Sequence, residues 1–137
     1  MTSAIPQDIE WRLPHRPRSV GRARTLLGEQ LHYWKVPDET AATAVLLLSE
    51  LLTNAVRHAT TPPGREVSAR AILRACGTLR IEVSDANTAR PEPQHPTPDA
   101  ESGRGLTLVA ALATAWDTGP RPYGIGKTVW FELAPTP

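Results

Sequence analysis

The sequence has few of the residues that mark a function by themselves. Cys76 is the only cysteine among 137 residues, so thiolates can build neither a disulfide framework nor a zinc site, and a reducing cytoplasm suits the chain. Lysine occurs only at Lys35 and Lys127, and 15 basic against 14 acidic residues give a formal net charge of +1. Because the charges balance, we expect neither a nucleic-acid partner nor an anionic membrane as partner.

Long apolar runs are also absent. Runs such as residues 44–48 are far shorter than the ~20 residues that span a bilayer. Asp8 and Glu10 stand where a signal peptide would need an apolar stretch, so we expect no export. A chain of this length buries roughly two thirds of the surface that its unfolded form exposes. We therefore expect one cytoplasmic domain over residues 1–137, with one core and one recessed site.

Hydrophobic periodicity predicts both helices and strands. The Pro-rich segment 86–102 has almost nothing apolar and is interpreted as a functional lid or a disordered segment. The order of elements predicts an α/β protein of the α+β two-layer type, with helices on one face of a mixed β-sheet. The predicted elements are a strand at 9–13, a helix between Pro17 and Pro37, a helix from Asp38 to about Ala59, strands at 67–73 and 79–85, a helix at 103–116 and a strand at 128–133.

The second predicted helix combines an apolar surface with a row of polar residues. Leucines and valines cover most of its sides, which predicts a helix buried nearly all round. Glu50, Asn54 and His58 stand at i, i+4 and i+8 and share one row. The row is either a solvent-facing stripe or the wall of a recess, and the neighbouring Leu47 and Leu51 favour the recess. A carboxylate and a carboxamide one turn apart suit a hard cation, and the carboxylate can accept a proton.

Three further places carry weaker signals. Asp85 ends a predicted strand, where it either binds a ligand or forms a turn. Residues 102–106 (SGRGL) put two glycines at the start of a helix, where backbone N–H groups attract an anion or where the glycines simply let a loop enter the helix. Residues 124–128 (GIGKT) are typical of a tight turn before the last strand. Each signal is modest alone, and their order along the chain is more specific.

In this order the motifs resemble the ATP-binding domain shared by gyrase, MutL and sensor histidine kinases, called the Bergerat fold or histidine kinase-like ATPase superfamily. The likeness is closest to small anti-sigma factor serine kinases of the actinobacterial type. Residues 50–59 look like the asparagine-containing helix of the family, and residues 83–85 like the strand end with its adenine-binding aspartate. Residues 103–106 are similar to its phosphate-binding glycine motif, and residues 126–130 to its final motif.

The resemblance implies a role for each matching residue. Glu50 would act as general base, Asn54 would hold Mg²⁺, and Asp85 would receive the adenine amino group. A lid would cover about residues 86–105. The remaining nucleotide contacts that the resemblance implies are Gly103, Arg104, Gly105 and Leu106 around the phosphates and Thr128 near the adenine.

Three residues within these motifs have less definite roles. Arg104 either neutralises phosphate charge or is simply exposed, as arginines usually are. Lys127 contacts either phosphate or only solvent. His58 is interpreted as a structural hydrogen-bonding residue rather than a catalyst.

The resemblance implies an ATP- and Mg²⁺-dependent protein serine/threonine kinase that binds a sigma factor and phosphorylates a STAS-type anti-anti-sigma protein. The alternative is a nucleotide-regulated protein-binding module without significant kinase activity. Glu50 favours the kinase, since ATP binding alone needs no general base, whereas residues 85–89 (DANTA) lack the glycines of the family pattern D-x-G-x-G and favour the module. The family also implies a possible homodimer through the N-terminal strand and first helix. These 137 residues include no phosphoacceptor histidine domain, so we expect no two-component sensor function.

Overall fold

The computed structural model describes residues 7–57, 66–85, 101–120 and 126–135, with the backbone alone for residues 101–105. His58 and most of the lid expected over about 86–105 lie outside the described residues. The described elements are, in order, β1 (Gln7–Pro14), α1 (Arg18–Tyr33), α2 (Asp38–Arg57), β2 (Glu66–Leu73), β3 (Leu79–Asp85), α3 (Glu101–Leu112), β4 (Ala115–Pro120) and β5 (Lys127–Leu133).

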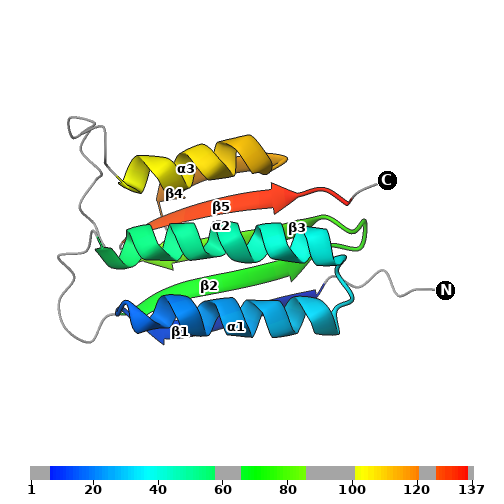
Figure 1. The fold of residues 1–137 in the computed structure, drawn as a ribbon, viewed down its shortest axis with the longest axis horizontal. Helices are drawn as coiled ribbons and strands as arrows, with labels where there is room; N and C mark the ends of the chain where they lie inside the picture. Colours follow the sequence, from blue (N-terminus) through cyan, green and yellow to red (C-terminus); the bar gives the residue numbers. More distant parts are fainter. Residues whose placement is uncertain (1–6, 58–65, 86–100, 121–125, 136–137) are drawn as a thin grey trace.

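The described elements form two layers, a sheet and a row of helices that covers one of its faces (Figure 1). The strand order is β1-β2-β3-β5-β4. Helix α2 lies between α1 and α3 and packs against both (Figure 1). The core lies between the layers, and its largest fully buried side chains include Phe131 of β5 and Leu27 of α1. The predicted two-layer α+β arrangement is therefore confirmed.

The sheet is antiparallel rather than mixed. All four described pairings, β1–β2, β2–β3, β3–β5 and β4–β5, are antiparallel. The difference comes from β4, a strand that the hydrophobic pattern of the sequence does not predict. If α3 led directly into β5, that strand would run parallel to β3, but β4 intervenes and the chain reverses again. Strands β3 and β4 do run in the same direction, yet β5 lies between them.

The helix predicted to reach Trp116 ends earlier, and Trp116 belongs to β4. Helix α3 ends at Leu112, and the Thr114 N–H donates a hydrogen bond of 2.8 Å to the Glu132 carbonyl of β5. This bond begins the sheet pairing before the strand itself starts. The strand is an edge strand in which Trp116 is the only large apolar residue, so neither the helical nor the strand period is visible in its sequence. Pro120 ends it, as an edge strand tolerates.

Helix α2 is buried on several sides but not all round. Leu47 and Leu48 are fully buried, as are Ala44 and Leu52. Leu46, by contrast, is 44% exposed, because α2 has a third side that faces neither the sheet nor the flanking helices. The prediction of a helix buried nearly all round is therefore wrong on that side.

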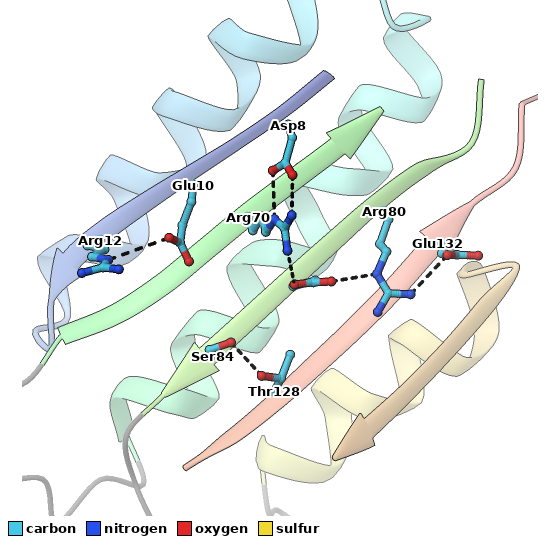
Figure 2. Close-up of polar contacts among 9 residues, drawn as sticks. Asp8, Glu10, Arg12, Arg70, Arg80, Ser84, Thr128 and Glu132 are labelled. Carbon is cyan, nitrogen blue, oxygen red and sulfur yellow. Dashed lines mark hydrogen bonds and ion pairs between the residues drawn. The ribbon is translucent and has the colours of Figure 1, made fainter. Parts of the chain in front are cut away.

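The face of the sheet that the described helices leave uncovered carries a network of ion pairs (Figure 2). Arg70 of β2 donates two hydrogen bonds to the Asp8 carboxylate, of which the one from Nε is 2.8 Å long, and it lies 3.6 Å from Glu82. Arg80 of β3 donates to Glu82 at 2.8 Å and to Glu132 at 3.3 Å. Opposite charges thus alternate across β1, β2, β3 and β5, which stabilises the register of these strands.

Replacing Asp8 with Asn is expected to lower stability at neutral pH but not in strong acid. The hydrogen bonds from Arg70 hold the pKa of Asp8 below its ordinary value, although partial burial opposes this. A lowered pKa contributes stability above the unfolded-state value and loses it as the pH falls through the folded-state value. The Asp8 side chain is 42% exposed, so we expect a loss of at most ~1 kcal/mol. Urea unfolding at neutral and strongly acidic pH measures it, and an equal difference at both would contradict this assignment.

Candidate functional site

Asp85 is a buried carboxylate at the end of β3. The residue is 4% exposed, and alternation along the strand puts it on the helix-covered face with Ile81 and Val83. Aspartate is almost never buried to this extent unless its charge is paired or used. The strand end is thus an internal position rather than a surface turn, which favours the ligand-binding interpretation of Asp85.

The register between β3 and β5 decides which residue of the 126–128 motif lies beside Asp85. Lys127 is directly opposite Asp85, and Thr128 is opposite Ser84. The Ser84 Oγ and Thr128 Oγ1 atoms are 2.8 Å apart and lie on the uncovered face (Figure 2). Successive residues of a strand point to opposite faces, so Lys127 shares the helix-covered face with Asp85. The structure therefore does not bring Thr128 together with Asp85 and places Lys127 there instead.

Glu50 and Asn54 lie one turn apart on α2, and both are half-buried. Their neighbours Leu47 and Leu51 are buried. This burial excludes a fully solvated stripe and supports the recess. Helix α2 packs against β3 and β5, and its C-terminal end lies at the end of the fold where β5 begins (Figure 1). The polar row therefore leads toward the Asp85 end of the sheet.

The glycine motif at residues 103–106 lies in the first turns of α3, which begins at Glu101 rather than Gly103. The N-terminal end of α3 lies at the same end of the fold as the C-terminal end of α2 (Figure 1). The first backbone N–H groups of a helix have no partner within it and carry partial positive charge, so they attract an anion. The Arg104 side chain lies outside the described residues, and Leu106 is 37% exposed.

These elements gather a set of groups that fits a nucleotide with Mg²⁺. Asp85 offers a buried acceptor, and the start of α3 offers N–H donors for an anion. The carboxamide oxygen of Asn54 suits Mg²⁺, which usually keeps few protein ligands and takes the others from phosphate and water. No group of three or more His, Cys, Asp and Glu among the described residues is placed to hold a metal ion. A cation at Asn54 would therefore find no such cluster of ligands among the described residues.

His15, in the connection between β1 and α1, contacts the end of α2 although no sequence motif includes it. Its Nε2 atom lies 3.0 Å from the Ala55 carbonyl oxygen, one residue from Asn54. The contact ties the last turn of α2 to this connection and so helps to fix where Asn54 lies. A single histidine outside any periodic pattern carries no spacing signal, so sequence reasoning had no means of finding it.

A groove of about 450 Å³ lies on the opposite, uncovered face of the sheet. The Arg80 guanidinium lies 4.0 Å from the centre of the Trp130 ring within it. Glu50, Asn54 and Asp85 do not line this groove. Its two arginines already pair with carboxylates of the same face, so we interpret it as part of the ion-pair network. The other residues that line it include Glu10, Arg70, Glu82, Ser84, Asp117 and Thr128.

Comparisons with known proteins point to one family. The model of the histidine kinase-like ATPase domain matches residues 13–132. The histidine kinase domain of the Erythrobacter litoralis EL346 blue-light activated histidine kinase is similar in structure, with a TM-score of 0.54 and 25% identity over 88% of this chain and 60% of that chain. A second structure of the EL346 blue-light activated histidine kinase gives a TM-score of 0.57 and 25% identity, over 88% of this chain and 41% of that chain. No curated protein matches the chain.

This chain thus corresponds to only part of the solved proteins that it resembles. None of its described helices is long and apolar enough to cross a membrane. The family match covers well over half of the chain and includes Glu50, Asn54, Asp85 and Lys127. The chain therefore belongs to the histidine kinase-like ATPase domain family, which implies that it binds ATP.

Proposed function

We propose that this chain is a cytoplasmic regulatory protein that binds ATP with Mg²⁺, phosphorylates a STAS-type anti-anti-sigma partner on serine or threonine, and also binds a sigma factor. One observation carries the proposal: the buried Asp85 carboxylate lies at the end of the fold toward which the half-buried Glu50–Asn54 row of α2 leads. A carboxylate of this kind suits recognition of a ligand N–H, and the row adds a cation ligand and a proton acceptor.

Different residues of the chain bind the adenine, the cation and the phosphates. ATP with Mg²⁺ supplies the phosphoryl group and neutralises its charge when bound. Asp85 accepts a hydrogen bond from the adenine amino group, and Asn54 holds the cation. The backbone N–H groups at the start of α3 hold the phosphates through their partial positive charge.

Glu50 provides the chemical step. Its carboxylate accepts the proton of the partner's hydroxyl as that oxygen attacks, which makes the oxygen a stronger nucleophile. Glu50 is half-buried, and the buried Leu47 and Leu51 beside it limit the access of water. An ATP-binding site without catalysis would not need a proton acceptor at this position.

The choice of serine or threonine is supported by the likeness of residues 50–59, 83–85, 103–106 and 126–130 to the anti-sigma factor kinases. The similar solved structures are of a histidine kinase, so the phosphorylated residue needs a direct test. We expect radiolabelled ATP to label a STAS-type partner with phosphate that survives acid, as phosphoserine does. Label that is lost in acid but stable in base would indicate phosphohistidine and contradict the proposal.

A binding module without kinase activity is the second candidate. Residues 85–89 read DANTA, without the glycines of the family pattern D-x-G-x-G. In such a module, ATP would only fix the conformation that a partner recognises. ATP-dependent binding of the partner without any phosphate transfer would favour this candidate.

Replacing Asn54 with Ala is expected to weaken ATP binding by about tenfold in Mg²⁺ and much less in EDTA, because the lost oxygen acts through the metal. Isothermal titration calorimetry in both buffers measures the effect. Gln30→Ala is the matched control, since it removes a carboxamide near the C-terminal end of α1. That end lies at the other end of the fold from the C-terminal end of α2, which carries Asn54 (Figure 1). Equal losses of affinity in the two buffers would show that Asn54 is not a magnesium ligand.

A further inference from the structure

We propose that Lys127 and Asp85 together recognise the edge of the adenine ring, with Asp85 accepting from the amino group and Lys127 donating to the adjacent ring nitrogen N1. The inference rests on the proposed function, since it concerns a bound ATP. It gives Lys127 a role in base specificity that the sequence motif had suggested for Thr128.

The strand register supplies the geometry. Lys127 and Asp85 are directly opposite each other in the β3–β5 pair, and the Cβ atoms of such pairs lie ~4.5–5.5 Å apart on one face of the sheet. Lys127 is half-buried, and Asp85 is buried. The ion pairs of the described residues all involve arginines, and none involves Lys127. Lys127 thus makes no ion pair with another described residue, and it lies on the same face of the sheet as Asp85.

Thr128 does not compete for this role. Its hydroxyl lies 2.8 Å from the Ser84 hydroxyl on the uncovered face, where it lines the groove of the ion-pair network. A shift of one residue in the register would exchange Lys127 and Thr128 between the faces. Such a shift would also expose Val129 and the fully buried Phe131, so the hydrophobic core holds Lys127 on the helix-covered face.

The chemistry of the two groups matches adenine and opposes guanine. Adenine presents an N–H donor beside the N1 acceptor, whereas guanine presents the O6 acceptor beside an N1–H donor. An ionised aspartate only accepts and a lysine ammonium only donates. Guanine would thus meet the wrong partner at both positions, and buried polar groups left unpaired are the strongest basis for rejecting a ligand.

The test is the affinity for 1-deaza-ATP, in which C–H replaces N1 while the amino group stays. We expect the native protein to bind ATP about tenfold or more tightly than 1-deaza-ATP, as for the loss of one hydrogen bond to a charged group. In Lys127→Met, which keeps the length of the side chain, the two ligands should bind equally. Lys35→Met is the matched control, because Lys35 is the only other lysine and follows α1 at the opposite end of the fold. It should keep the native ratio.

Two outcomes would overturn the inference while the proposed function stands. One is a native protein that binds ATP and 1-deaza-ATP equally. The other is a ratio that is kept in Lys127→Met but lost in Thr128→Val. A native protein that binds neither ligand would refute the proposed function and this inference with it. Thermal unfolding of each variant separates a loss of recognition from a loss of folding.

Discussion

Replacing Glu50 with Gln is expected to slow phosphoryl transfer to a verified partner by ~10²–10⁴-fold, the usual contribution of a general base. The amide keeps the shape of the side chain but cannot accept a proton at neutral pH. ATP affinity should hardly change, because the proposed nucleotide contacts come from Asp85, Lys127, Asn54 and the start of α3. Single-turnover transfer from radiolabelled ATP measures the rate, and calorimetry measures the affinity.

Glu29→Gln is the control for this experiment, because Glu29 is an exposed residue of α1. It should transfer phosphate at the native rate. Transfer at the native rate by Glu50→Gln as well would show that Glu50 is not the base. If neither the native protein nor Glu50→Gln transfers phosphate while both bind the partner only with ATP, the binding module becomes the better account.

Replacing Asp85 with Asn is expected to weaken ATP binding by ~10- to 150-fold and to reduce the preference for ATP over GTP. Hydrogen bonds to charged groups contribute about 1.5–3 kcal/mol, which corresponds to this range of affinity. Asn has nearly the same volume as Asp but offers both a donor and an acceptor, so at this position it can pair with guanine O6 as well as with the adenine amino group, while Lys127 still opposes guanine. Competition between ATP and GTP for the nucleotide-binding site measures this preference.

The matched control is Asp117→Asn on β4, since Asp117 is exposed and lies on the uncovered face. This variant should keep the native preference for ATP. An unchanged preference in Asp85→Asn would reduce Asp85 to a structural residue of the strand end. Because Asp85 is buried, the unfolding temperature of the variant must be measured alongside, so that lost recognition is distinguished from lost folding.

Most of the fold could be predicted from hydrophobic periodicity. Alternating apolar residues predicted β1, β2, β3 and β5, and three-and-four spacing predicted the three helices, because each element buries one face in the core. Strand β4 could not be found in this way, since an edge strand with one large apolar residue buries too little to leave a pattern. Because β4 was not predicted, β5 was expected to run parallel to β3, and the sheet was wrongly predicted to be mixed.

The candidate site was predictable in its residue types but not in its orientation. The i, i+4 spacing of Glu50 and Asn54 and the position of Asp85 at a strand end are visible in the sequence. The choice between Lys127 and Thr128 depends on strand register, which motif matching ignores. The alternation of Val129, Phe131 and Leu133 in the sequence already favours Lys127 over Thr128. Lys127 is an even number of residues from these core residues, so it lies on their face of the sheet. The contact between His15 and Ala55 depends on tertiary packing alone.

The position of β5 between β3 and β4 has a consequence for synthesis of the chain on the ribosome. Strands β1, β2 and β3 can pair as soon as they emerge, because each is antiparallel to the one before it. Asp85 gains its neighbour Lys127 only when β5, the last described strand along the chain, joins the sheet. Domains are made from the N-terminus at a few to ~20 residues per second, so nascent chains that stop before β5 should fold in part yet fail to bind ATP.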